Sequence, residues 1–229
     1  MKKENQINKR KARNLHYLGL AYRQAKRDGT LVAKIMKPLK PEESISALIF
    51  EKETALFSLN YPTMIEYKNI KFVSALMLFV YLLSEELQHE EVKYKVILFS
   101  KNNEILIKFL ENEINEKDIL EKEHNFKKWS KFNETLDLYK DELISLRNIK
   151  TIKEILNKCN LLKFNQNEYL KMKLLKTEDV NIYYNSENSL LGTGFIDKDL
   201  YKYKETLKND KTNLLGISVT ETRTKLMRH

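Results

Sequence analysis

The order of hydrophobic and polar residues predicts a basic amphipathic helix at the N-terminus. Four apolar residues recur there at helical spacing: Leu15, Leu18, Tyr22 and Ala25. Gly29 stands where such a helix would end, and Lys26 and Arg27 occupy its last turn, where cations suit the helix dipole. The prolines Pro38 and Pro41 then interrupt the pattern and predict a linker.

Beyond this linker the pattern predicts a sheet and its covering helices. Three short apolar runs, at residues 44–51, 55–61 and 64–70, predict a three-stranded antiparallel meander. Residues 71–88 are apolar almost all round, which predicts a buried helix packed on the sheet. Residues 92–100 alternate and then become wholly apolar, as in a central strand, and residues 103–114 predict another helix.

The middle of the chain is helical by pattern. Apolar spacing predicts helices with breaks over residues 117–147, and Thr151-Ile-Lys-Glu154 is a capping box that opens a short helix ending near residues 157–160. Asn165 is placed to cap a further helix through Lys173. Further on, the pattern predicts strands and a closing helical turn: strands at 180–184, 189–196 and 214–219, and the turn at 221–227.

These elements predict a helix-rich α+β protein. Its expected parts are a basic N-terminal segment over residues 1–40 and an α+β core over 41–229, with a helical insertion at 115–175. The composition agrees, since the 229 residues include only five Gly and three Pro, too few for a turn-rich β-sandwich or a Gly-rich nucleotide loop. Hydrophobic residues make up 42% of the chain, which is enough for a substantial core.

The element order over residues 44–114 resembles the start of the ribonuclease H-like fold. The resemblance implies a metal-binding Asp in the first strand, a Glu in the first helix and an Asp at the end of the fourth strand, which together hold two divalent cations. This chain offers Glu51 at the first place, Phe72-Val-Ser-Ala75 at the second and Ser100 at the third. The resemblance therefore implies the fold without the catalysis of that family.

The distribution of charge along the chain is the strongest indication of function. Residues 1–40 contain twelve Lys and Arg against Glu4 and Asp28, whereas the other 189 residues contain 29 Lys and Arg against 30 Asp and Glu. The whole net charge of +9 therefore comes from the first forty residues, a net +10 there against −1 elsewhere. Such a concentration of cations attracts a polyanion.

The residue types in this segment favour nucleic acid, with RNA slightly preferred over DNA. Arginine forks bind phosphate and stack on bases, interleaved aromatic rings offer stacking surfaces, and the chain has no zinc finger or recognisable helix-turn-helix. We expect a nucleic-acid-binding protein without catalysis of its own, whose contacts come from these residues: Lys9, Arg10, Lys11, Arg13, His16, Tyr17, Arg23, Lys26 and Arg27.

Two other functions are open at this point. The basic arm also suits a protein-interaction or inhibitory subunit that grips an acidic partner or a ribonucleoprotein complex. A metal-dependent nuclease with a rearranged site would need carboxylates from later segments, such as Glu178, Asp179, Asp197 or Asp199. The sequence predicts no cofactor and no membrane partner. The absence of an apolar leader behind Met1 and the single cysteine predict a cytoplasmic protein.

The remaining chemical motifs predict structural roles. Cys159 reads as a small buried apolar residue, and Gly192-Thr-Gly194 reads as a hairpin or turn. The four histidines lack metal-ligand spacing, and the paired glutamates near residues 85–91 and 111–121 lie among lysines, as on solvated helix faces. The tyrosine pairs Tyr183-Tyr184 and Tyr201/Tyr203 suit either packing or the stacking of single-stranded bases.

Overall fold

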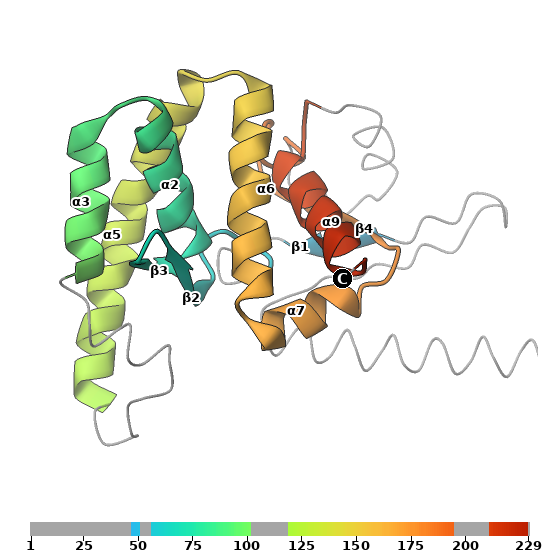
Figure 1. The fold of residues 1–229 in the computed structure, drawn as a ribbon, viewed down its shortest axis with the longest axis horizontal. Helices are drawn as coiled ribbons and strands as arrows, with labels where there is room; N and C mark the ends of the chain where they lie inside the picture. The colour runs from blue at the N-terminus through green and yellow to red at the C-terminus, as the bar shows by residue number, and fades with distance from the viewer. Residues whose placement is uncertain (1–46, 51–55, 102–118, 195–210, 229) are drawn as a thin grey trace, which may run out of the picture.

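The computed structural model describes residues 47–50, 56–101, 119–194 and 211–228, and helices predominate among them (Figure 1). They form six helices and four short strands, which confirms the predicted helix-rich α+β class. One hydrophobic cluster extends from Leu48 to Leu226 and includes residues of every helix and strand between them. No helix in this described part is long and apolar enough to cross a bilayer.

The centre of this core is α2 (Ala75–Glu86), which confirms the buried helix that the sequence predicts. The helix begins four residues later than expected, because Ser74 caps it by accepting a hydrogen bond from the backbone N–H of Met77 at 3.2 Å. Residues 75–84 are all buried, and α2 contacts α3, α5 and α6. Figure 1 shows α2 enclosed between these helices.

A hairpin precedes α2 and replaces two of the expected elements. Strand β2 (Pro62–Tyr67) pairs antiparallel with β3 (Ile70–Ser74). Lys68 and Asn69 link them with φ values of 51° and 60°, the left-handed pair that a tight hairpin turn requires. The predicted strand at 64–70 is confirmed over residues 64–67 but ends at the turn at 68–69, and the predicted helix start at 71 is wrong, because residues 70–74 form β3.

The predicted three-stranded meander is also wrong. Strand β1 (Ala47–Phe50) pairs in parallel with β4 (Asn181–Tyr184), 134 residues further along the chain, in a separate two-stranded sheet. Residues 56–61, expected to be a strand, form consecutive turns. Parallel pairing between distant segments cannot be read from local alternation, although the strand at 180–184 itself is confirmed.

The predicted central strand at 92–100 is instead the helix α3 (Glu90–Lys101). Its buried residues, Val92, Val96 and Ser100, lie four residues apart, which is the helical period. Glu91 and Lys95 form an ion pair at 2.6 Å on the outer face, again at helical spacing. The strand that the ribonuclease H-like element order requires at residues 92–100 is therefore replaced by a helix.

The middle of the chain forms three helices: α5 (Ile119–Ser145), α6 (Ile149–Asn165) and α7 (Glu168–Leu175). Helix α5 has no break over its 27 residues. Helix α6 begins at its cap Asn148 and continues beyond the predicted end at 157–160, because Leu156, Cys159 and Phe164 bury one continuous face. Helix α7 follows Asn167, not the predicted cap Asn165.

The last element, α9 (Leu214–Leu226), overturns the predicted strand at 214–219 and absorbs the predicted turn at 221–227. It packs on α6 and β4. Its apolar residues Leu214, Leu215 and Val219 fit a short strand by pattern, but they lie on the buried side of a helix. The proposed strand at 189–196 is turn over its described residues, 189–194, and the helix expected at 103–114 lies outside the described residues.

Candidate functional site

The residues that the sequence singled out for nucleic-acid binding lie outside the described residues. This holds for all nine, from Lys9 to Arg27, and also for Glu51, Asp197 and Asp199. The basic segment therefore stays a prediction. What the structure adds is a polar cavity among the described residues.

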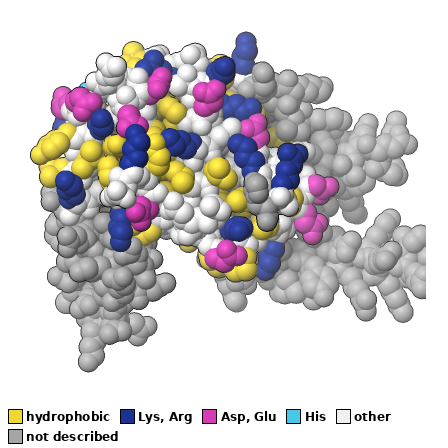
Figure 2. All heavy atoms as spheres, in the orientation of Figure 1, with side chains coloured by type: hydrophobic (Ala, Val, Ile, Leu, Met, Phe, Trp, Pro, Cys, Tyr) yellow, Lys and Arg dark blue, Asp and Glu magenta, His cyan; other side chains and the backbone are white. Residues whose placement is uncertain are grey.

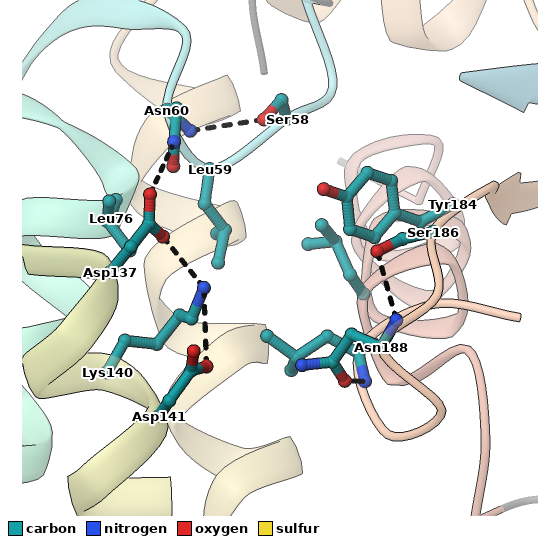
Figure 3. A pocket seen from close by; sticks show the side chains of 12 residues that line it. Ser58, Leu59, Asn60, Leu76, Asp137, Lys140, Asp141, Tyr184, Ser186 and Asn188 are labelled. Carbon is teal, nitrogen blue, oxygen red and sulfur yellow. Dashed lines mark hydrogen bonds and ion pairs between the residues drawn. The ribbon is translucent and has the colours of Figure 1, made fainter. Parts of the chain in front are cut away.

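The cavity has a volume of about 310 Å³ and opens between α5 and the segment that follows β4 (Figure 3). Figure 3 shows the charged side chains of α5 on one side, Tyr184, Ser186 and Asn188 on the other, and Leu59 between them. Five parts of the chain meet here: residues 58–60, α2 through Leu76, α5, residues 184–191 and α9.

Helix α5 contributes the charged groups. Asp137, Lys140 and Asp141 follow one another at helical spacing, and Leu136 and Leu143 bury the neighbouring face against α2. The Nζ atom of Lys140 lies 2.7 Å from Asp137 Oδ1 and 3.5 Å from Asp141 Oδ1. Burial lowers the pKa of Lys140, but the charge and hydrogen bond of Asp137 outweigh burial, so its pKa lies above the ordinary value and the group stays an ammonium.

The turns at residues 56–61 contribute Ser58 and Asn60. The Nδ2 atom of Asn60 donates to Asp137 Oδ2 at 3.4 Å, so this amide faces the carboxylate of α5. Lys163, a fully buried residue of α6, donates from Nζ to the backbone carbonyls of Leu56 and Ser58 at 2.7 and 2.6 Å. Burial lowers the pKa of Lys163 to about 7. These two bonds tie the turns to α6.

The segment after β4 is shaped by a chain of local hydrogen bonds. Asn188 Oδ1 accepts from the backbone N–H groups of Leu190 and Leu191 at 3.0 and 2.8 Å. Gly192 closes the turn, and a Cβ atom on it would lie 2.7 Å from Ser186 Cβ and 2.8 Å from the carbonyl oxygen of Tyr184. The prediction that Gly192-Thr-Gly194 is a turn rather than a nucleotide loop is confirmed.

Asn213 fixes the end of β4 from the other side. Its Oδ1 accepts from the backbone N–H of Tyr184 at 2.9 Å, and its Nδ2 donates to the carbonyl of Ile182 at 3.1 Å. The ring of Tyr184 stacks on Phe50 of β1 with centroids 5.0 Å apart and an interplanar angle of 21°. The tyrosine beside the cavity is thus held by both its backbone and its ring.

The other candidates behave as packing or surface groups. Cys159 is buried, as predicted, and burial raises the pKa of its thiol, which leaves it unreactive. Within the described ranges, no three His, Cys, Asp or Glu residues converge as a metal site would require. The glutamates at 85–91 lie on solvated faces as predicted, for example Glu85 with Lys68 at 2.8 Å. Glu178 and Asp179 are exposed after α7.

Sequence reasoning missed the cavity residues. Asp137, Lys140 and Asp141 fall within the helices predicted over residues 117–147 and were not singled out, although their i, i+3, i+4 spacing places them on one face. That spacing was a usable signal. The other cavity residues lie in segments that the parallel β1–β4 pair brings together, among them Asn60, Tyr184 and Asn188. The local sequence does not predict this pairing.

A scan of the chain against models of known protein families finds no match, and a search of curated proteins finds no significant similarity.

Proposed function

We propose that the protein binds nucleic acid, RNA in preference to DNA, through its basic N-terminal segment and without catalysing a reaction on it. The observation that carries this proposal is the charge distribution: twelve Lys and Arg against two acidic residues in the first forty positions, beside a remainder close to neutral. Each phosphate that a cation neutralises releases counterions, which makes such a segment bind polyanions strongly at low salt.

The kinds of residue in the segment support a nucleic acid over another polyanion. Arg10, Arg13, Arg23 and Arg27 offer planar forks for phosphate, and His16 and Tyr17 alternate with them along the chain. Aromatic rings contribute stacking on unpaired bases, which single-stranded RNA exposes and duplex DNA does not. This mixture is the reason for preferring RNA.

The described residues offer further cations that could add to such binding. Residues 149–176, which span α6 and α7, contain seven Lys and two Glu, and Lys150, Lys158 and Lys176 are exposed. On α7, Lys173 Nζ lies 5.3 Å from the ring centroid of the half-exposed Tyr169. Figure 2 shows Lys and Arg side chains spread over the visible face, interspersed with Asp and Glu side chains.

The test is a titration of the full chain with labelled single-stranded RNA, single-stranded DNA and duplex DNA at two salt concentrations. We expect salt-dependent binding that is tightest for RNA. Replacing Arg10, Lys11, Arg13, Arg23 and Arg27 by Ala should weaken it and reduce the slope of log K against log salt by about 0.7 per lost phosphate contact. Folding should be unaffected.

The matched control removes five positive charges elsewhere, at the exposed residues Lys101, Lys131, Lys211, Lys225 and Arg228. This variant should keep most of the affinity. Equal losses in the two variants would mean that net charge alone drives binding and would contradict the proposed site. Absence of binding to all three nucleic acids would contradict the function and favour an acidic protein partner.

A further inference from the structure

Among the described residues, the cavity beside α5 presents both a hydrogen-bond donor and a carboxylate acceptor to a ligand. We propose that it holds one unpaired guanine base of the bound strand. Asp141 and Lys140 would read the Watson–Crick edge of the base, with Tyr184 beside its ring. This inference rests on the proposed nucleic-acid binding, which it deepens by naming the base that the folded part selects.

The three charged groups of α5 do not have equal capacity left for a ligand. Asp137 is engaged through both oxygens, by Lys140 and by Asn60. The side chain of Asp141 is 62% exposed, and within the described ranges its ion-pair contact is the 3.5 Å approach of Lys140 to Oδ1. An ammonium has three donors, and Lys140 directs two of them to the aspartates. A donor and a carboxylate are therefore side by side at the cavity.

Guanine matches this pair better than the other bases do. Its Watson–Crick edge carries an acceptor, O6, next to two donors, N1–H and the N2 amino group. A carboxylate accepts both of these donors at once while the ammonium donates to O6. Adenine and cytosine offer one amino donor each beside ring acceptors, and uracil offers a single N–H between two carbonyls. Each of these three bases presents only one donor next to an acceptor, so we expect all three to bind less tightly than guanine.

The shape of the cavity also suits a base. Its volume of about 310 Å³ is at the small end of ligand pockets, enough for a base with part of its ribose. Figure 3 places Tyr184 across the cavity from Asp141, and its stacking on Phe50 keeps the ring in a fixed plane. Recognition of splayed-out bases by aromatic rings and polar edges is the usual mode for single-stranded RNA.

The charge of the cavity argues that a base enters it and a phosphate does not. Two carboxylates, Asp137 and Asp141, stand against the single ammonium of Lys140. A phosphate would be repelled, whereas the neutral edge of guanine presents its N–H groups to the negative side. The phosphates of the same strand would then be held elsewhere, by the basic N-terminal segment. The N-terminal segment would supply most of the affinity, and the cavity would select the base.

The experiment compares four labelled RNA ten-mers: oligouridine, and the same strand with one central guanine, adenine or cytosine. We expect the strand with guanine to bind at least about tenfold more tightly than oligouridine, within the range of one bidentate base contact. In Asp141→Asn this preference should disappear while oligouridine binds as before, since Asn replaces one acceptor oxygen by an N–H group that opposes the donors of guanine.

The control keeps the same helix and removes acidic charge outside the cavity. Glu134 and Glu142 are exposed residues of α5, and Glu134→Gln or Glu142→Gln should retain the guanine preference. The half-exposed position of Asp141 makes its substitution compatible with folding, which a thermal melt of each variant verifies. A second variant, Tyr184→Leu, should lower affinity for the guanine strand more than for oligouridine.

The outcomes separate this inference from the function on which it rests. Salt-dependent binding of all four strands with equal affinity overturns the guanine site and leaves nucleic-acid binding standing. If no strand binds, the proposed function fails, and a titration with the nucleoside guanosine, which has no phosphate, tests the cavity by itself. Binding of guanosine that is lost in Asp141→Asn would support a site for the base alone, and no binding would overturn the site altogether.

Discussion

Around α2 the core is closed by apolar side chains, whereas around β4 it is closed by hydrogen bonds from buried polar groups. Residues 75–83 of α2 are apolar and buried, and they contact the apolar faces of α3, α5 and α6. On the other side, Lys163 and Arg223 are buried cations that donate to backbone carbonyls. The two regions share one hydrophobic cluster but depend on different interactions.

This difference between apolar and polar packing indicates which region can bind a ligand. Apolar packing is dense, non-directional and indifferent to pH, and it leaves no groups for a ligand. The region around β4 holds several buried polar groups by specific bonds: Asn160 Nδ2 donates to Ser218 Oγ at 2.9 Å, and Arg223 donates to Thr177 Oγ1 at 2.8 Å. The cavity lies on that side, and its stability should respond to charge and pH.

The largest effect should come from placing a charge in the apolar region. Leu78→Asp puts a carboxylate at a position of α2 with 0% exposure, so it should cost several kcal/mol and unfold the protein. Leu98 was expected to be equally buried, in a central strand, and this is wrong, since it is 40% exposed on α3. Leu98→Asp should therefore fold. Urea denaturation followed by circular dichroism measures both, and a cooperatively folding Leu78→Asp would contradict the described core.

The next effect concerns the buried cation of the polar region. Burial lowers the pKa of Lys163 to about 7, below the usual 10.5 of the unfolded chain. Between these values the unfolded chain binds more protons than the folded one, so stability should rise with pH from about 7 toward 10.5, by at most about 1.4 kcal/mol per unit. Below pH 7 both states are protonated and Lys163 contributes no slope.

Lys163→Met isolates this contribution, because other groups titrate equally in both proteins. The measurement is the free energy of unfolding at pH 6, 7, 8 and 9. The difference between wild type and variant should be flat up to pH 7 and then grow in favour of the wild type. A constant difference over the whole range would show that the charge of Lys163 is compensated in the folded state and that its two carbonyl bonds act independently of pH.

A smaller loss should follow from removing the side chain that fixes β4. Asn213 has a φ of 54°, and it bonds the backbone of both Ile182 and Tyr184. Asn213→Gly tolerates this backbone and loses both bonds, so we expect a cost of about 2 kcal/mol. Asn213→Ala should cost more, because Ala disfavours positive φ. Thermal melts of both variants test this order, and equal melting temperatures would contradict the role of the backbone conformation.

The same contrast explains how far the sequence predicts the structure. The helix α2 and the strand at 181–184 could be predicted from the sequence. A long stretch that is apolar on every side is typical of a buried helix, and a short run of β-branched and aromatic residues is typical of a strand. Residues 92–100 were misassigned, since Val-Lys-Tyr-Lys-Val alternates as a strand does, whereas the fold uses the period of Val92, Val96 and Ser100. Sequence alone cannot show which period tertiary packing selects.

The candidate site was less predictable than the fold. The basic segment is a compositional feature and needs no structure to be seen, while the cavity requires α5 and the end of β4 to meet. Their meeting depends on the parallel pairing of Ala47–Phe50 with Asn181–Tyr184 and on Lys163, whose burial contradicts its residue type. Hydrophobic periodicity shows neither the strand pairing nor the burial of Lys163. The sequence alone could therefore predict a phosphate-binding segment but not the cavity.

The smallest expected effect tests a bond that belongs to neither region. Asn148 is an exposed N-cap of α6, and its Oδ1 accepts from the backbone N–H of Thr151 at 2.9 Å. Asn148→Ala leaves that N–H to water and should cost about 1 kcal/mol, while Asn148→Ser and Asn148→Asp should cost less, because both supply a capping oxygen. The measurement is the urea midpoint, with an unchanged slope as evidence that the unfolded state is the same. The sequence predicted that this helix is capped at Thr151, so a Thr151→Ala variant separates the two possible caps. If Thr151→Ala lost more stability than Asn148→Ala, the helix would begin at the later residue. The link between α5 and α6 would then be longer than the structure has it.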